Sequence, residues 1–467
     1  MATISRPVLP KTPLPCHPFF ASQQGKMLRE KAEVRSPLNR LLGGTLLDIS
    51  RVAEGGAHVR HASWSVGLAS EGTCPTLFPC IQPRLGNQPS KKGLSTISYE
   101  RRFSVLDAPL SATETLKKYR KYITDWEAKE VAGYQVVFFL GLRAEKVKVD
   151  GKKPNCGFDD DTSNYLTPLN DHLAYRFEIL SFLGKGAYGK VVRCFDHLAH
   201  THVAIKIIRS LRSAQKLAEM EIDMLESAKY VEGVVEFKES FRFREHTCLV
   251  FEELDISLYA YLRLGLSLSL PLIRLLLQQL LQTLSQLHQR SIIHCDLKLD
   301  NILFRDRSRT SIKLIDFGTA VTERTQVLGY TQTRFYRAPE VLFGVKAGHM
   351  VDMWSFGCLA AEMFTRRPLF AGESEHDQLR LIAEALGSPP ADLVAKAGKA
   401  GGLFDSSGRT KQPAGICRRP VLSQLLSSLP EVLADLVAQC LQWSPSSRLS
   451  AEAALQHPFF YSKIAHV

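Results

Sequence analysis

The sequence predicts an α+β fold of two lobes, a small antiparallel sheet with one key helix and a larger, mainly helical lobe, preceded by a disordered tail. Three observations support this prediction. β-prone segments with alternating apolar residues lie between residues 175 and 254. After residue 270, apolar residues recur at steps of four and three, as in helices with one buried face. Residues 1–100 show no sustained periodicity.

Bulk properties exclude several classes of protein. The 467 residues suffice for two or more domains, and 45% hydrophobic residues is typical of a globular chain. No apolar run approaches the roughly 18 residues of a membrane span, so we expect no membrane association. The net charge of +12 would suit nucleic acid, but no zinc-finger spacing or RNP signature is present, and we do not expect nucleic-acid binding. We expect a monomer.

The ten cysteines form no CxxC pair, and no clear signal peptide precedes them. This pattern predicts reduced thiols and an intracellular protein, located in the cytoplasm, the nucleus or both.

Residues 1–100 are predicted to form the disordered tail. Prolines cluster near its start and Gly-Gly pairs recur, so the segment buries too little apolar area to offset its ordering entropy. The clustered prolines are Pro7, Pro10, Pro13, Pro15 and Pro18.

Residues 101–170 are expected to form a segment that packs on the following domain; an independent binding activity is the alternative. Ser111 with Glu114 three residues later predicts a capped helix. A second helix is expected near Asp125, and Tyr134–Leu142 reads as an apolar strand.

Residues 171–255 are predicted to form the smaller lobe, which opens with a glycine-rich hairpin. A G-x-G-x-x-G alone is weak, since dinucleotide-binding folds use it too, but there it leads straight into a helix. Here the β-prone run Val191–Phe195 follows. The glycines would let the hairpin backbone close over phosphates without side-chain collision; a plain β-turn is the alternative. The nucleotide-binding residues predicted from this hairpin are Leu183, Gly184, Gly186, Gly189 and Val191.

The next strand ends in Lys206, at the distance expected of a lysine that binds nucleotide phosphates. We assign Glu221, on the following helix, as its partner, because the ion pair would orient the lysine towards the α- and β-phosphates. Glu219 is the competing choice, and a solvated acid is the other interpretation. Glu221 is preferred because Met220 and Met224 would flank it on the inward face.

A buried-strand run that ends at Phe251 predicts the connection between the lobes. Phe251 would border an adenine pocket, and the backbone groups of Glu252 and Leu254 would bond the adenine edge. Ala204 above and Leu303 below would enclose the ring. Core packing alone would also explain these apolar residues.

Residues 256–460 are predicted to form the larger lobe. Its strongest helix is Pro271–Gln289, whose apolar face should be core. The helix leads to a short loop that carries an acid, a lysine and an amide. The apolar face comprises Ile273, Leu277, Leu280, Leu284 and Leu287.

The loop at 294–301, together with a later Asp-Phe-Gly, carries the predicted chemistry. Asp296 would orient a substrate hydroxyl and accept its proton, and Lys298 would neutralise charge on the transferred phosphoryl group. Asn301 and Asp316 supply the oxygen ligands that Mg²⁺ prefers. An isolated loop Asp is usually a turn former, but the order and spacing of these residues favour phosphoryl transfer from ATP.

Two further roles are expected to be structural. Glu340, in Arg-Ala-Pro-Glu, should form a buried ion pair with Arg448 near the C-terminus. Asp352 should begin a buried helix and bind the backbone of the catalytic loop.

The region 171–460 resembles the eukaryotic protein-kinase family, with every main motif matched. Within the CMGC group of that family it resembles the dual-specificity tyrosine-regulated kinases (DYRK). Cys295 stands where most kinases have Arg, and the nine residues 332–340 are a second, quite specific sign. Residues 170–176 resemble that family's entry into the kinase domain, and residues 110–142 resemble the homology box of its class 2 members.

This resemblance implies a bilobal kinase that uses ATP and Mg²⁺ to phosphorylate Ser and Thr of protein substrates, commonly before Pro and after an upstream Arg. It also implies autophosphorylation of one activation-loop tyrosine, which maps to Tyr330. Cys295 cannot anchor a phosphate, but Arg334 and Arg337 lie close enough in sequence to clamp a phosphotyrosine there. Asp300 maps to an acid that faces a substrate Arg; simple loop solvation is the alternative.

The sequence departs from the family at three positions that bear on specificity. Leu328 replaces the first Tyr of Tyr-x-Tyr, Leu299 replaces a Pro, and Asp300 replaces a longer Glu. These changes leave substrate preference open. A non-catalytic kinase-fold scaffold or regulatory binding protein is the alternative function, but such proteins normally lack the Lys, the catalytic Asp or the metal-binding Asp.

Overall fold

The computed structural model describes residues 106, 108–323, 331–396 and 422–462. The expected disordered tail, residues 1–100, lies outside these ranges, and so does Tyr330.

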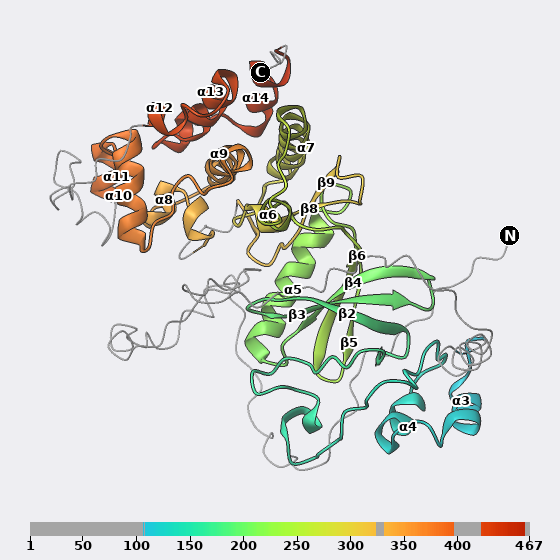
Figure 1. Ribbon diagram of the computed structural model, residues 1–467. Coiled ribbons are helices and arrows are strands. Elements are labelled where there is room, and N and C mark those ends of the chain that lie inside the picture. The colour runs from blue at the N-terminus through green and yellow to red at the C-terminus, as the bar shows by residue number, and fades with distance from the viewer. Residues whose placement is uncertain (1–105, 107, 324–330, 397–421, 463–467) are drawn as a thin grey trace.

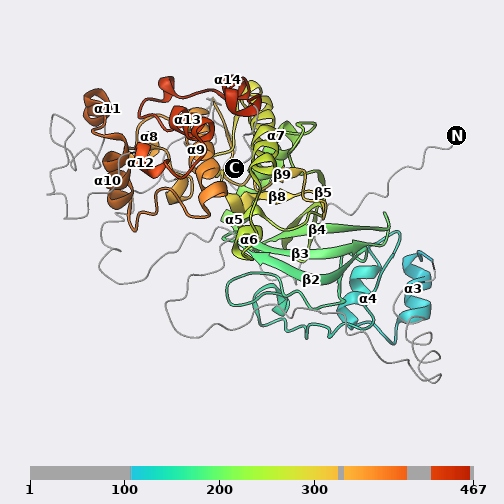
Figure 2. The same ribbon diagram turned by 45° about the horizontal axis from the view of Figure 1, so that its top comes forward.

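The fold has the two predicted lobes (Figures 1 and 2). The smaller lobe is built on a six-stranded antiparallel sheet in the order β1-β2-β3-β4-β6-β5. Consecutive hairpins explain this order, except that β6 inserts between β4 and β5. The strands are β1 His172–Leu173, β2 Phe177–Lys185, β3 Gly189–Asp196, β4 Thr201–Ile208, β5 Phe237–Phe243 and β6 His246–Glu252.

The sheet and helix α5 (Arg212–Ser227) pack through apolar residues at the periods that the sequence shows. In β4, Val203, Ile205 and Ile207 alternate inward and are almost fully buried. Helix α5 buries Ala218 and Leu225 together with Glu221, which places one acid inside the lobe.

The larger lobe is mainly helical and is built around α7 and α9. Ser269 caps α7 by accepting a hydrogen bond from the Leu272 N–H, and Pro271 lies in the first turn, where its missing N–H costs nothing. All five predicted core residues of α7 are buried. The helices are α6 Leu258–Arg263, α7 Leu270–Gln289, α8 Pro339–Leu342, α9 Met350–Thr365, α10 Glu375–Leu386, α11 Ala391–Lys396, α12 Leu422–Leu425, α13 Glu431–Cys440 and α14 Ala451–Leu455.

Two small two-stranded sheets carry the loops of the site between the lobes. Strand β7 (Ile292–Ile293) pairs with β10 (Val321–Thr322), and β8 (Ile302–Phe304) pairs with β9 (Ile312–Leu314). The catalytic loop therefore leaves β7 and enters β8.

Both structural roles expected in this lobe are confirmed. Arg448 donates to both carboxylate oxygens of Glu340, at 2.7 and 2.6 Å, and the two side chains are at most 1% exposed. Asp352, in the first turn of α9, accepts from the backbone N–H groups of His294 and Cys295, at 2.9 and 3.0 Å.

Residues 108–171 lie on the side of the sheet away from the larger lobe (Figures 1 and 2). Helices α3 (Ala112–Tyr119) and α4 (Asp125–Val131) both begin with complete capping boxes, and the one predicted at Ser111 is confirmed. The apolar strand predicted at 134–142 is wrong: only Val137 forms a bridge, to Leu110. Buried side chains of this stretch instead pack into the same core as the sheet.

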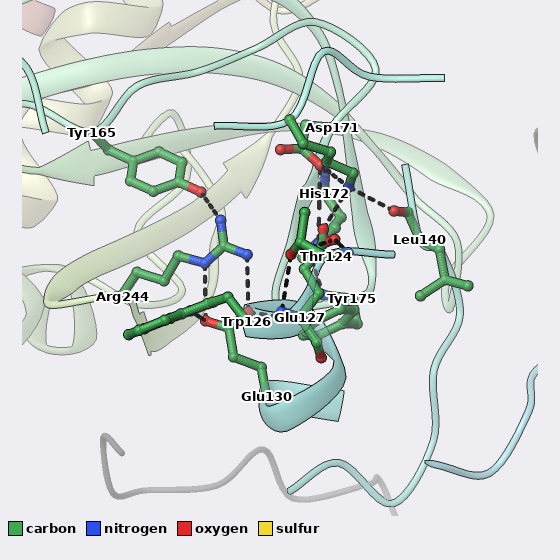
Figure 3. A network of polar contacts seen from close by, with 11 residues as sticks. Thr124, Trp126, Glu127, Glu130, Leu140, Tyr165, Asp171, His172, Tyr175 and Arg244 are labelled. Atoms are coloured by element: carbon green, nitrogen blue, oxygen red, sulfur yellow. Dashed lines mark hydrogen bonds and ion pairs between the residues drawn. The ribbon is translucent and has the colours of Figure 1, made fainter. Parts of the chain in front are cut away.

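A buried polar network fixes α4 to the sheet (Figure 3). The guanidinium of Arg244, from the β5–β6 turn, donates to both oxygens of Glu130 at 3.0 and 2.9 Å and to the Tyr165 hydroxyl at 3.0 Å. The Tyr175 hydroxyl donates to Glu130 at 2.7 Å. Because buried charges are stable only when paired, these contacts make α4 part of the smaller lobe.

Candidate active site

The glycine-rich hairpin β2–β3 lies over the space between the lobes. A Cβ at Gly189 would lie 2.1 Å from the Ile207 carbonyl oxygen, so this position requires glycine. At Gly186 a Cβ would meet nothing within 4 Å, which leaves room beside the turn. Leu183 is half exposed and Val191 is buried. The Gly186 N–H closes the turn by donating to the Gly189 carbonyl at 2.9 Å.

Lys206 lies beneath this hairpin in a buried set of charges. Its Nζ donates to Glu221 Oε1 and Oε2 at 2.7 and 2.8 Å, and to Asp316 Oδ1 at 3.1 Å. Burial lowers the pKa of Lys206, but the carboxylates of Asp316 and Glu221 outweigh it and raise that pKa. The lysine is therefore a permanent cation. Burial opposes ionisation of Asp316, yet Lys206 lowers its pKa to about 2.

The choice of Glu221 over Glu219 as the partner of Lys206 is confirmed, but part of the reasoning for it is wrong. Met220 is 42% exposed and does not flank the pair. Met224 packs against the core, and Leu225 is buried.

The residues expected around an adenine ring lie at the connection between the lobes. Ala204 pairs with Phe251 across β4 and β6, and both are half-buried, as are Leu254 and Leu303. Glu252 ends β6, and its N–H donates to Glu236 O. Within the described ranges, the Leu254 N–H has no backbone acceptor.

Asp352 holds the catalytic loop by accepting a hydrogen bond from the Cys295 N–H. Cys295 itself has a positive φ of 63°. Lys298 Nζ donates to Asp296 Oδ2 at 2.7 Å, and Asn301 Nδ2 donates to the same oxygen at 3.2 Å. The loop thus brings three of the predicted residues together.

The side-chain oxygens of Asn301 and Asp316 are suitable ligands for a cation. Asn301 uses its amide nitrogen on the Asp296 carbonyl at 2.8 Å, whereas its Oδ1 is buried with no hydrogen-bond partner among the described residues. A buried oxygen without a donor is costly unless a cation or water meets it. Asp316 offers a carboxylate that is ionised at neutral pH. Amide and carboxylate oxygens suit Mg²⁺.

Thr333 belongs to this site, although the sequence analysis assigns it no role. Its Oγ1 donates to Asp296 Oδ1 at 2.7 Å, and its N–H donates to the same oxygen at 2.9 Å. Lys298 Nζ donates to Thr333 Oγ1 at 3.1 Å. The only sequence signal was a hydroxyl residue between the catalytic loop and Arg-Ala-Pro-Glu.

Asp300 lies beside a second acid that the sequence analysis missed. Glu362, on α9, accepts from the Tyr336 hydroxyl at 2.6 Å. Burial, with a smaller contribution from Asp300, raises the pKa of Glu362 to about 7. Burial also raises the pKa of Asp300. Glu362 and Tyr336 are both buried, and Asp300 acts on them electrostatically. Nothing in the local sequence distinguishes Glu362 from other helix acids.

Arg334 and Arg337 lie on the activation segment, a few residues after the undescribed residues 324–330. Arg334 Nη1 donates to the Glu373 carbonyl at 2.7 Å, and Arg337 donates to the Gln332 carbonyl and to Glu375 Oε1, both at 2.7 Å. Their predicted partner Tyr330 is outside the described ranges, so the phosphotyrosine clamp stays a prediction.

A further set of possible metal ligands, Glu127, Asp171 and His172, lies in the smaller lobe. Lys146 Nζ approaches Glu127 Oε1 and Asp171 Oδ1 at 2.6 Å each. The ammonium already pairs with both carboxylates, so the cluster is an ion-pair network (Figure 3).

Among the described residues, no helix has both the length and the apolar character needed to cross a membrane.

Comparisons with known proteins agree with the geometry. The protein kinase domain model matches residues 177–460. The chain is 38% identical over 366 residues to human dual specificity tyrosine-phosphorylation-regulated kinase 4, covering 75% of this chain and 70% of that protein. It is 36% identical over 422 residues to mouse dual specificity tyrosine-phosphorylation-regulated kinase 3, covering 84% and 70%. A fruit-fly dual specificity tyrosine-phosphorylation-regulated kinase 2 is 36% identical over 377 residues, covering 76% and 51%.

Proposed function

This chain is an ATP-dependent protein kinase that belongs to the DYRK family, and from this premise we propose that it phosphorylates Ser and Thr of protein substrates and autophosphorylates Tyr330. One observation carries the proposal. Lys206 binds Glu221 and the half-buried Asp316, whereas Asp296 binds Lys298 and Thr333. The two sets are within electrostatic reach of each other, because Lys298 helps to lower the pKa of Asp316.

In the proposed nucleotide site, Lys206 binds the α- and β-phosphates and Glu221 holds the lysine in place. The 2.7 Å contact between them supports this assignment. The hairpin covers the phosphates, and the connection between the lobes binds adenine through Glu252 O and Leu254 N–H. The remaining proposed contacts are Leu183, Gly184, Gly186, Gly189, Val191, Ala204, Phe251 and Leu303.

In the proposed transfer step, Asp296 orients the substrate hydroxyl and accepts its proton as the bond to the γ-phosphoryl group forms. Thr333 is a positioning residue, since its hydroxyl and N–H both hold Asp296 Oδ1. Lys298 contributes positive charge beside the transferred group. Asn301 and Asp316 would hold Mg²⁺, which supplies charge neutralisation on the phosphates when bound.

For substrate selection, we propose that Asp300 and Glu362 bind an upstream substrate Arg. Two carboxyls and a tyrosine hydroxyl match the donors of a guanidinium, and an arriving cation would favour the ionised form of Glu362. This assignment supports an Arg-directed preference despite the shorter acid at Asp300. Preference for Pro after the target residue is carried over from the family alone.

For regulation, we propose that phosphorylated Tyr330 binds Arg334 and Arg337. Both guanidiniums lie within seven residues of Tyr330 along the chain. A phosphotyrosine can accept charge-assisted hydrogen bonds from such a pair.

We propose further that residues 101–170 are a homology-box segment packed on a kinase domain with lobes 171–255 and 256–460, and that the protein acts as a monomer inside the cell, in the cytoplasm or nucleus. A reducing compartment is supported by five buried free thiols in the described ranges. They are Cys194, Cys248, Cys295, Cys358 and Cys440.

The test uses the full chain, labelled ATP with Mg²⁺, and a peptide with Arg upstream of Ser-Pro. Wild type should label the peptide, whereas Asp296→Asn should lose nearly all activity while still binding nucleotide. Equal labelling by both forms would refute the catalytic assignment. Silence from both would favour the scaffold alternative, which has no support from the intact Lys206, Asp296 and Asp316.

A further inference from the structure

The glycine-rich hairpin carries two lysines whose charges need a partner. Lys185 and Lys190 are directly opposite each other in the register of β2 and β3, at the base of the turn that contains Gly186 and Gly189. Residues directly opposite in an antiparallel pair point to the same face, and like charges there destabilise the pair. A neighbouring anion would remove this repulsion and hold the turn.

The anion is supplied by the chain before the kinase domain. Residues 159–165, here named the acidic loop, are closed by a bridge between Asp159 and Tyr165. Asp160 Oδ1 accepts from the Thr162 N–H and hydroxyl at 2.9 and 2.7 Å and from the Asn164 N–H at 3.0 Å. These bonds to Oδ1 hold the loop together, and the other carboxylate oxygen, Asp160 Oδ2, makes its contact outside the loop.

That oxygen faces the hairpin. Lys190 Nζ lies 3.1 Å from Asp160 Oδ2 and donates to the Tyr165 carbonyl, also at 3.1 Å. Lys185 Nζ donates to Thr162 Oγ1 at 3.4 Å. Both lysines thus reach the acidic loop from the two strands of the hairpin.

Arg209, just after β4, joins the acidic loop to the tip of the hairpin. Its Nε donates to the Thr162 carbonyl at 2.7 Å, and its Nη1 donates to the Ala187 carbonyl at 3.4 Å. Its backbone N–H donates to the Tyr188 carbonyl at 2.9 Å. One side chain therefore bridges the two loops.

The other side of the acidic loop is fixed to the body of the smaller lobe. His246, which is fully buried, approaches Asp159 Oδ1 at 2.8 Å through Nε2. The Ser210 N–H donates to the Ser163 carbonyl at 3.0 Å. In Figure 1 the chain between α4 and β2 runs beside the sheet. The acidic loop is thus bonded to the body of the smaller lobe on one side and to the hairpin on the other.

We propose that the acidic loop is a positioning element of the ATP site: through Asp160 and Lys190 it holds the glycine-rich hairpin in its phosphate-binding geometry. The proposal rests on ATP use by this chain and extends the site to residues outside the matched kinase domain. A hairpin that is already held loses less conformational freedom when nucleotide binds, so the affinity for ATP is higher.

The test compares Asp160→Asn with Asp161→Asn in the full-length protein. The two changes remove the same charge one residue apart, but the exposed Asp161 side chain makes no hydrogen bond or ion pair within the described residues. We expect the Kd for Mg-ATP, measured by isothermal titration calorimetry, to rise about fivefold in Asp160→Asn and to stay at the wild-type value in Asp161→Asn. Amide hydrogen exchange should accelerate in residues 184–191 only in Asp160→Asn.

Lys190→Gln is the second variant. It should raise the Kd for Mg-ATP to a similar extent, and the double variant with Asp160→Asn should be no weaker than either single one. Equal Kd values for Asp160→Asn and Asp161→Asn, or additive effects in the double variant, would overturn the proposal. Circular dichroism shows whether Asp160→Asn folds. If it does not, an unchanged Kd for Mg-ATP in folded Lys190→Gln would overturn the proposal.

Wild-type binding and peptide labelling are measured first, which separates this inference from the proposed function. A wild-type protein that fails to bind Mg-ATP overturns both. An active wild type whose Asp160→Asn variant binds Mg-ATP normally overturns only the role of the acidic loop.

Discussion

Thr333→Val removes one hydroxyl from the catalytic centre at nearly constant volume. In the structure that hydroxyl donates to Asp296 Oδ1 at 2.7 Å and accepts from Lys298 Nζ at 3.1 Å. The Thr333 N–H, which donates to the same carboxylate oxygen at 2.9 Å, is unaffected. The Asp296 carboxylate in the variant therefore loses one of its two hydrogen bonds from Thr333 and keeps the other.

The size of the effect follows from these contacts. A hydrogen bond to an ionised group contributes roughly 1.5–3 kcal/mol, and the two bonds share one hydroxyl, so their contributions do not add. A loss of about 2–3 kcal/mol in the transition state corresponds to a kcat about 30- to 150-fold lower. The KM for ATP should not change, because Thr333 has no contact with the proposed nucleotide residues.

Steady-state peptide phosphorylation measures this effect, with Thr333→Ser as the rescue variant and Thr331→Val as the control. Among the described residues, the Thr331 hydroxyl makes one hydrogen bond, a long one of 3.5 Å to the Cys295 carbonyl, so its variant should keep wild-type kcat. A Thr333→Val enzyme with a normal melting temperature and a kcat within about threefold of wild type would refute the reasoning, since threefold is below the contribution of one such bond.

Three further outcomes are expected. Arg448→Met leaves the buried Glu340 carboxylate unpaired and should destabilise the fold by about 3–5 kcal/mol, lowering Tm by roughly 10 °C in a calorimetric scan; an unchanged Tm contradicts the pairing. Because the pKa of Glu362 is raised to about 7, its ionised fraction falls between pH 8 and pH 6, and the KM for an Arg-containing peptide should rise by up to about tenfold while a peptide with Ala in place of Arg shows no such rise. Mass spectrometry of active protein should find phosphate on Tyr330, and unmodified Tyr330 in fully active protein would exclude the tyrosine switch.

The smaller lobe extends beyond the matched kinase domain. The Arg244–Glu130 pair and the acidic loop both join residues before 177 to the sheet. A protein truncated at the start of the match would leave Arg244 buried without its carboxylate, which is strongly destabilising for a buried charge. Variants for kinetic work should therefore retain residues from 106 onward.

Residue order alone determined the lobes and most of the candidate site. The glycine-rich turn, Lys206 and the loop at 294–301 are recognisable because each task requires a particular residue type at a short, fixed spacing. Helix starts were predictable for the same reason: the capping box at Ser111 and the proline near the start of α7 act within one helical turn. Glu221 was also found, although Met220 gave a misleading reason.

Only the tertiary structure decided the contacts between distant segments. Thr333 and Asp296 are 37 residues apart, and Arg244 and Glu130 are 114 apart. The stretch 134–142 has an apolar composition that suits a strand, but core packing against the sheet took the place of strand pairing. Local propensities act over a few residues, so the reacting groups could be identified from the sequence. A buried charge is stable only where the folded chain brings a partner to it, so the residues that hold the reacting groups depend on the tertiary structure.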